Sequence, residues 1–138
     1  MISALVALMS ALALAAVVGW LLNRRAGHVR ATDPGTADEV DTRDLGLSAD
    51  GPTVVHFTAP WCSPCTQVRR VVTQVCTDLG DVAHVEIDMD TNPAAARRLS
   101  VLSLPTTFIF DARGRQRYRA SGVPKADDLR SALTPLLA

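Results

Sequence analysis

Residues 53–79 constrain the fold most, because signals for a buried strand, a close cysteine pair and an amphipathic helix follow one another directly. Residues 53–57 form a compact run rich in β-branched side chains, which is typical of a buried strand. Between residues 65 and 79 valine and leucine recur at helical spacing, and Gly80 then provides a stop. A strand that leads straight into a helix predicts the α/β class.

The chain beyond residue 80 repeats this alternation of strands and helices. Asn92 and Pro93 supply an N-cap residue followed by proline at the first helical position, which predicts a helix to about residue 99. The remaining patterns predict strands over residues 82–87, 106–110 and 116–120, a hairpin turn over 111–114 and a helix over 125–137. The order β-α-β-α-β-β-α predicts one central sheet flanked by helices.

Residues 1–22 carry no charged side chain and are long enough to span a membrane as a helix, with a length of roughly 33 Å. Trp20 lies near the end of the run, where interfacial tryptophans are common, and Arg24 and Arg25 follow it. A cleaved signal peptide would need a basic n-region and a small-x-small site after the apolar core. A buried core helix would need a polar face. We therefore expect an uncleaved transmembrane anchor, with the other two interpretations as alternatives.

Residues 23–52 are rich in Asp, Thr, Gly and Ala, and we interpret them as a linker to a globular domain over 53–138. A short helix is expected around residues 40–45. The basic residues nearest the apolar run all follow it, at Arg24, Arg25 and Arg30. The positive-inside rule then predicts a single-pass membrane protein with its globular domain in the cytoplasm. An extracytoplasmic location is the alternative.

The sequence Trp61-Cys62-Ser63-Pro64-Cys65 lies between the predicted strand and helix, a context that makes a C-x-x-C pair a redox motif. A helix N-terminus lowers the pKa of a nearby thiol through its free N–H groups and its dipole. Cys62 is expected there, with Cys65 about one turn inside the helix. Cys62 would attack a substrate disulfide and Cys65 would resolve the mixed disulfide. Trp61 would form a flat rim for a docked polypeptide.

On these residues the segment from about 53 to 137 resembles the thioredoxin family. The motifs that carry the resemblance are Trp61-Cys62-x-Pro64-Cys65, the Leu104-Pro105-Thr106 loop in which the family has a cis-proline facing the cysteines, the turn glycine Gly114 and the late glycine Gly122. The resemblance implies a thioredoxin-like fold with a mixed central sheet, here preceded by one transmembrane helix.

The family further implies a dithiol–disulfide oxidoreductase whose substrate is a disulfide in another protein. It implies no bound cofactor and no metal, so electrons come from an upstream reductase or from another dithiol protein. The residues that the resemblance places around Cys62 and Cys65 are Ser63 and Pro64 as support and Trp61, Leu104, Pro105 and Gly122 as the substrate-binding surface.

The sequence departs from the family pattern at two places. Ser63-Pro64 replaces the usual Gly-Pro, a chemically close change that favours a reducing protein. His56 stands where the family has a buried Asp, and His84 stands where that Asp has its Lys partner. An imidazole titrates near neutrality, so His56 is a candidate base for the Cys65 thiol, and a hydrogen-bonded core histidine is the alternative.

Other functions are disfavoured by composition. The formal net charge is +0 and aromatic residues make up 4% of the chain, so a nucleic-acid partner is not expected. Zinc would need a second ligand pair, and Cys76 is expected to be a core residue too far along the helix to pair with Cys65.

Rival functions are an extracytoplasmic reductase for cytochrome maturation or envelope proteins, sulfane-sulfur or peroxide repair, and a non-catalytic binding module with vestigial cysteines.

Overall fold

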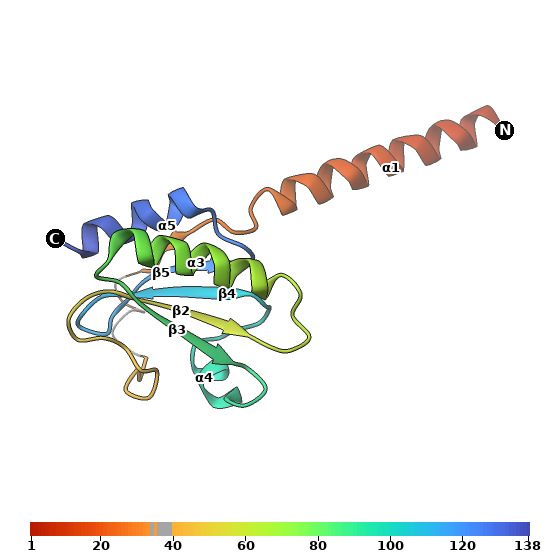
Figure 1. Ribbon diagram of the computed structural model, residues 1–138. Helices are drawn as coiled ribbons and strands as arrows, with labels where there is room; N and C mark the ends of the chain where they lie inside the picture. The colour runs from red at the N-terminus through yellow and green to blue at the C-terminus, as the bar shows by residue number, and fades with distance from the viewer. Residues whose placement is uncertain (34, 36–39) are drawn as a thin grey trace.

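The computed structural model describes residues 1–33, 35 and 40–138, and it consists of a projecting N-terminal helix and an α/β domain (Figure 1). The helices are α1 (Ile2–Asn23), α3 (Cys65–Leu79), α4 (Pro93–Arg98), α5 (Ala126–Leu133) and the 3-10 turn η1 (Thr134–Leu136). The strands are β1 (Arg30–Ala31), β2 (Thr53–Thr58), β3 (Ala83–Asp88), β4 (Thr106–Phe110) and β5 (Gln116–Ser121).

The five strands form one mixed sheet in the order β1-β5-β4-β2-β3. Strand β2 runs parallel to β3 and antiparallel to β4, and β5 pairs antiparallel with both β4 and β1. Helices α3 and α5 cover one face of the sheet, and α4 lies on the other (Figure 1). The thioredoxin-like architecture expected from the sequence, a mixed sheet flanked by helices, is confirmed.

Strand β2 is buried along its whole length because each face of the sheet has its own core. Val54 packs with α3 and α5, whereas Val55 and Phe57 pack with α4, as expected when successive strand residues point to opposite faces. Phe57 and Phe108 meet edge to face at 5.8 Å within the α4-side core. A strand buried on both faces needs an almost continuous apolar run, which the sequence supplies.

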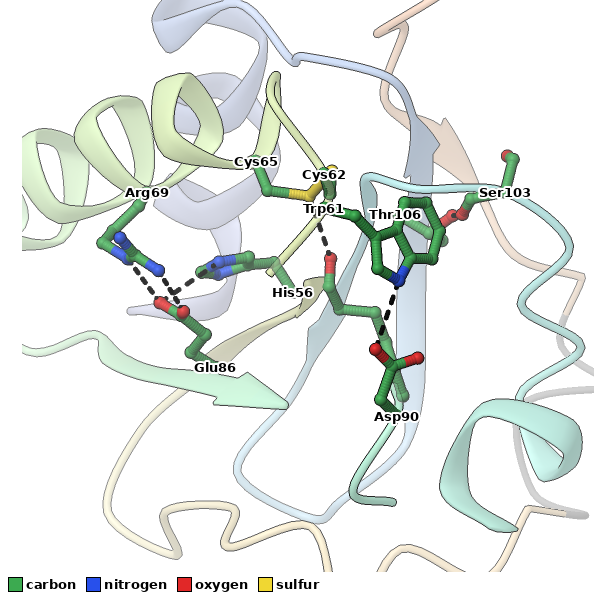
Figure 2. The surroundings of a disulfide bond; sticks show 10 residues. His56, Trp61, Cys62, Cys65, Arg69, Glu86, Asp90, Ser103 and Thr106 are labelled. Carbon is green, nitrogen blue, oxygen red and sulfur yellow. Dashed lines mark hydrogen bonds and ion pairs between the residues drawn. A yellow bond between two sulfur atoms is a disulfide. The ribbon is translucent and has the colours of Figure 1, made fainter. Parts of the chain in front are cut away.

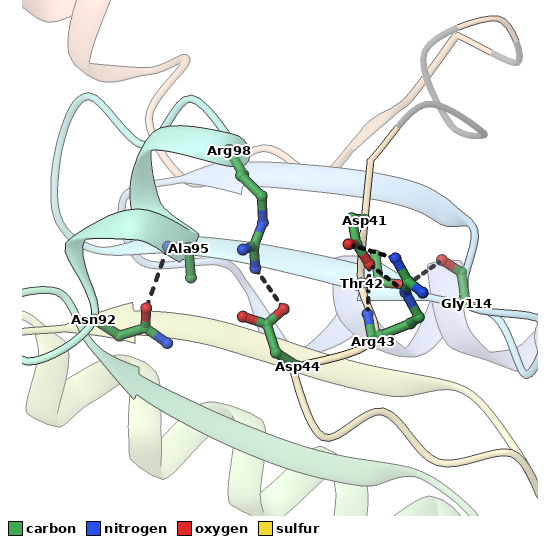
Figure 3. Close-up of polar contacts among 8 residues, drawn as sticks. All are labelled: Asp41, Thr42, Arg43, Asp44, Asn92, Ala95, Arg98 and Gly114. Atoms are coloured by element: carbon green, nitrogen blue, oxygen red, sulfur yellow. Dashed lines mark hydrogen bonds and ion pairs between the residues drawn. The ribbon is translucent and has the colours of Figure 1, made fainter.

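Part of the predicted linker lies against the domain. Arg30 and Ala31 pair with β5, and Leu45 is only 2% exposed within the α4-side core. Figure 3 shows the segment held by an ion pair between Asp44 and Arg98, and by the hydroxyl of Thr42 near the Gly114 carbonyl. The expected helix over 40–45 is wrong, because residues 43–46 form a turn. Residues 34 and 36–39 of the predicted linker lie outside the described part.

No residue of α1 is buried, so the interpretation of residues 1–22 as a core helix is wrong. The helix is long and apolar enough to cross a membrane, a property that an N-terminal signal sequence shares. At its end the guanidinium of Arg24 lies 3.4 Å from the centroid of the Trp20 ring, a close cation–π contact. The positive charge is thereby placed where the apolar run stops.

Candidate active site

The cysteine pair lies at the carboxyl end of β2, where a turn leads into α3 (Figure 2). Cys62 and Cys65 are joined by a disulfide, with their Cα atoms 5.5 Å apart. The amide of Cys62 donates to the Ala59 carbonyl at 3.0 Å, and the amide of Cys65 donates to the Cys62 carbonyl at 3.3 Å. These bonds wind the chain into a turn that brings the two sulfur atoms together.

Helix α3 begins at Cys65 itself, directly after Pro64. The prediction that Cys65 lies one turn inside the helix is therefore wrong, and Cys62 lies in the turn before it. Proline lacks an N–H and fits the first positions of a helix, so Pro64 marks the start of regular structure. Cys62 still faces the end of α3 that carries free amides and the positive end of the helix dipole.

The two sulfur-bearing residues differ in accessibility. Cys62 is 8% exposed and Cys65 1% exposed, and the Sγ of Cys65 lies 3.8 Å from the carbonyl oxygen of Phe57. Leu104, from the neighbouring loop, packs against the cluster formed by Ala59, Cys62 and Cys65. An incoming disulfide can therefore approach Cys62 more easily than Cys65.

Trp61 forms an exposed aromatic surface beside this pair. Its side chain is 68% exposed, and its indole N–H donates to Asp90 Oδ2 at 3.1 Å (Figure 2). Asp90 follows β3, so the contact joins the ends of two neighbouring strands. This hydrogen bond favours one orientation of the indole. Sequence reasoning missed Asp90, because no local pattern relates it to Trp61.

The loop that faces the cysteines contains the cis peptide bond Leu104–Pro105, as the sequence predicted. The hydroxyl of Thr106 donates to the Ser103 carbonyl at 2.7 Å and closes this loop. The carbonyl of Pro105 accepts a hydrogen bond of 2.8 Å from the amide of Gly122. Pro105 and Gly122, two of the residues predicted to bind substrate, are thus adjacent, while the predicted support residue Ser63 is exposed in the turn.

A second cluster of polar groups lies on β2 and β3. His56 is fully buried, and its Nδ1 lies 2.8 Å from Nε2 of His84. Its Nε2 lies 3.4 Å from Glu86 Oε2 but makes no aligned hydrogen bond. Glu86 is paired with Arg69 of α3. The register explains the cluster, because His56 is opposite Glu86, and His84, two residues earlier on β3, points to the same face.

Burial is the main cause of the lowered pKa values of the two histidines. It lowers the pKa of His56 to about 4, with the nearby His84 acting in the same direction and Glu86 opposing both. Burial also lowers the pKa of His84, and the hydrogen bond from Arg69 lowers the pKa of Glu86. At neutral pH the two imidazoles are therefore neutral and Glu86 is ionised.

The sequence predicted the partnership of His56 and His84 but missed Glu86 and Arg69. Glu86 could have been found, because it lies two residues after His84 in a predicted strand and so shares its face. Arg69 could not, because its role depends on how α3 packs over β3. A hydrogen-bonded pair of neutral imidazoles, with a carboxylate beside the buried ring, can accept and pass on one proton.

Cys76 is a free, buried cysteine on α3, as expected for a core residue. Burial raises the pKa of its thiol to about 11, so at neutral pH it is not a thiolate. Within residues 1–33, 35 and 40–138, no three His, Cys, Asp or Glu side chains are arranged to hold a metal ion.

Comparison with known proteins gives one consistent result. The family model named Thioredoxin matches residues 40–135. The thioredoxin of Mycolicibacterium smegmatis is 41% identical over 78 residues, which cover 54% of this chain and 68% of the relative. A Mycobacterium tuberculosis thioredoxin is 34% identical over 89 residues, covering 64% of this chain and 72% of the relative.

Solved structures agree with the sequence relatives. A mutant thioredoxin from Halobacterium salinarum superimposes with a TM-score of 0.59 and 30% identity, over 66% of this chain and 79% of that one. Chloroplastic thioredoxin z gives a TM-score of 0.57 and 31% identity, over 63% and 79% of the two chains. The family match begins at residue 40 and so does not include α1.

Proposed function

Because this chain belongs to the thioredoxin family, it is a thiol–disulfide oxidoreductase, and we propose that it reduces disulfides in other proteins with Cys62 as the attacking thiol. The Cys62 thiolate attacks one sulfur of the substrate disulfide, and the other substrate sulfur leaves as a thiolate and takes up a proton. The Cys65 thiolate then attacks the Cys62 sulfur and releases the second substrate thiol. Two electrons pass to the substrate, and the Cys62–Cys65 disulfide remains.

The difference in accessibility between the two cysteines carries this assignment. Cys62 is 8% exposed beside the exposed ring of Trp61, whereas Cys65 is 1% exposed beneath the turn. A large partner can therefore approach Cys62 more readily than Cys65. The Cys65 sulfur needs only to reach Cys62, to which it is bonded in the oxidised protein. An upstream reductase or a dithiol protein must then reduce this disulfide for the next turnover.

His56 serves in this proposal as the base that deprotonates Cys65. Its neighbour Phe57 places a carbonyl oxygen 3.8 Å from Cys65 Sγ, and Figure 2 shows the imidazole beneath the disulfide. The depressed pKa of His56 leaves the ring neutral at pH 7 and able to accept a proton. Glu86, whose charge favours the protonated ring, would stabilise the imidazolium that forms. His56 would thus take over the proton transfer that the buried Asp carries out in the family.

We also infer that residues 1–22 remain as a membrane anchor and that 23–52 connect it to the domain of 53–138, against which Arg30, Ala31 and Leu45 pack. The absence of buried residues in α1 and the stacking of Arg24 on Trp20 at its end support this. The positive-inside rule places the domain in the cytoplasm, and reduction of envelope or cytochrome-maturation proteins is the alternative on the other side. A topology reporter fused after Ala138 distinguishes the two sides.

The roles of the cysteines are tested by trapping. Cys65→Ser should accumulate mixed disulfides with substrate proteins, because the intermediate can no longer be resolved. Cys62→Ser should accumulate none. Cys76→Ser is the matched control and should behave like the unaltered protein, since that thiol is buried and protonated. Trapping by Cys62→Ser and not by Cys65→Ser would show that the roles are reversed.

A further inference from the structure

The end of the membrane helix is connected to the active site through a short series of backbone hydrogen bonds. The amide of Gly27 donates to the Ser121 carbonyl at 2.6 Å. The next residue, Gly122, donates from its amide to the Pro105 carbonyl at 2.8 Å. Leu104, which precedes Pro105, packs against the cluster that contains Cys62 and Cys65. The juxtamembrane chain and the redox pair therefore lie on either side of one loop.

This connection requires glycine at two facing positions. Gly27 has φ +81°, and a Cβ there would come within 2.1 Å of the Val123 carbonyl oxygen. Gly122 has φ +89°, and a Cβ there would lie 3.1 Å from the Gly27 nitrogen. Only glycine adopts these conformations without strain and permits such a close approach of two backbones. The backbone after α1 thus packs closely against Gly122, which the sequence predicted to bind substrate.

A groove of about 720 Å³ opens between the helix end and the active-site loop. Its lining includes Leu22 from the last turn of α1 and Leu104 from the loop beside the disulfide. Among the described lining residues, Arg25, Arg30 and Arg119 are basic and Asp33 is acidic. The guanidinium of Arg119 donates to the carbonyls of Leu99 and Ser100, so Arg25 and Arg30 supply the more available charge. The groove therefore extends from the last turn of α1 to Leu104, which packs against the cluster that contains the disulfide, and its described lining has more basic than acidic side chains.

If α1 spans the bilayer as proposed, the position of the groove is fixed relative to the membrane. From Asn23, the last residue of α1, to the docked Gly27 the chain advances four residues, which can span at most about 14 Å. The active-site end of the domain cannot move far from the bilayer while Gly27 stays bonded to Ser121. A partner that reaches Cys62 along the groove must present its cysteine close to the membrane surface.

We propose that this groove binds an acidic, extended segment of an integral membrane protein, and that the cysteine pair of this segment lies beside the bilayer. The inference rests on the proposed function, since the reaction is the same exchange: two electrons pass between the partner's cysteine pair and Cys62–Cys65. The arginines select acidic side chains, and the short tether selects disulfides near the membrane. Trp61, 68% exposed beside Cys62, adds an apolar contact beyond the groove.

The experiment uses the reduced full-length protein in vesicles of neutral phosphatidylcholine. The probes are disulfide-containing peptides on a single transmembrane helix, with the disulfide either about 5 or about 30 residues from the bilayer, and with acidic or neutral flanks. The same acidic peptide without its helix reports the basal activity. We expect the near, acidic disulfide to be reduced at least about tenfold faster than the distant one, because only the near one can lie in the groove.

Two changes to the protein separate tethering from charge. A flexible insert of about ten Gly and Ser residues directly after Asn23, which keeps Arg25 beside the docked Gly27, should abolish the near-over-far preference and leave reduction of the soluble peptide unchanged. The pair Arg25→Gln and Arg30→Gln should slow the acidic probes, including the soluble one, by about fivefold and leave the neutral near probe unchanged, since rim charges contribute modestly. Arg70→Gln with Arg97→Gln removes two exposed arginines elsewhere and should have no effect.

The outcomes are distinct. Equal rates for near and distant disulfides, or a preference that persists with the insert, would overturn the proposal. Equal rates for acidic and neutral flanks, together with inhibition by phosphatidylglycerol in the vesicles, would assign the groove to lipid headgroups and also overturn it. Failure to reduce even the soluble peptide would instead contradict the proposed function.

Discussion

His56 is the residue where this chain departs most from its family, and its proposed role makes a kinetic prediction. His56→Gln keeps a hydrogen-bonding side chain of similar size but removes the base, so resolution of the mixed disulfide by Cys65 should slow by more than about tenfold near neutral pH. The initial attack by Cys62 should change much less. Stopped-flow measurement of the two steps separately checks this.

Urea unfolding of the same variant, measured in parallel, is the control for the kinetic experiment. If His56 is only a hydrogen-bonded core residue, His56→Gln should lower stability and leave both steps near normal in the folded fraction. Unchanged resolution in a folded variant would therefore remove His56 from the mechanism. His84→Gln, which alters the partner of the ring and not the ring itself, should slow resolution by a smaller factor.

The depressed pKa of His56 also predicts how stability depends on pH. The pKa is about 4 in the folded protein against 6.5 for an ordinary histidine, so the unfolded chain binds protons first as pH falls. Stability should be complete above about pH 6.5 and should fall by up to about 3 kcal/mol toward pH 4. Burial of His84 adds to the loss in the same direction.

Urea unfolding of the full-length protein in detergent micelles at pH 7.5 and at pH 4.5 measures this loss. His56→Gln should lose distinctly less free energy of unfolding between the two pH values, because it carries no titrating group at that position. Parallel losses in the two proteins would show that other groups, such as carboxylates, account for the acid sensitivity.

At the scale of single residues, the sequence was sufficient to identify the reactive cysteines and insufficient to identify the residues that contact the site around them. Cys62 and Cys65 were identifiable because their spacing and their place between strand and helix are local properties. The pairing of His56 with His84 followed from the parallel register expected of the family. The contact of Trp61 with Asp90, and that of Glu86 with Arg69, depend on packing between elements and could not be read from local patterns.

Among the elements, those with strong periodicity were predicted within about one residue at most ends. Strand β2 and helix α3 begin at the predicted residues 53 and 65. The last helix ends earlier than predicted, at Leu133, and continues as a 3-10 turn containing Pro135. Strand β1 was missed because it has two residues, and its pairing with β5 depends on backbone contacts with a distant segment.

The N-cap of α4 gives a prediction at this scale. Asn92 Oδ1 accepts a hydrogen bond of 3.3 Å from the amide of Ala95 (Figure 3), and α4 has only six residues. Asn92→Ala should lower the free energy of unfolding by about 1 kcal/mol, whereas Asn92→Asp should keep most of it. Urea denaturation of the full-length protein measures both.

The exposed ion pair between Asp44 and Arg98 offers a comparison for the cap. Asp44→Asn, which removes this pair at the end of the same helix, should cost less than about 1 kcal/mol because the pair is open to solvent. An Asn92→Ala variant as stable as the unaltered protein would show that packing of Ala95 and Ala96 alone determines α4.

For the whole molecule, the retained anchor is the prediction with the widest consequences. If α1 stays attached and spans the bilayer, membranes washed with alkaline carbonate should keep the full-length chain, because an integral helix resists extraction that removes peripheral proteins. Immunoblotting and N-terminal sequencing of the membrane fraction check this. Recovery of a shortened soluble form that begins between residues 11 and 23 would instead identify a cleaved signal peptide.

The two-residue strand β1 has a consequence for any attempt to study the domain without its anchor. Strand β1 is the outermost strand next to β5, and the amide of Thr32 adds a bond of 2.9 Å to the Arg117 carbonyl. Removing the first 32 residues would leave the outer backbone groups of β5 without these partners and able to pair with a second molecule. The liberated domain should then keep its disulfide chemistry but self-associate edge to edge, so the segment that connects the anchor to the domain also protects the protein from aggregation.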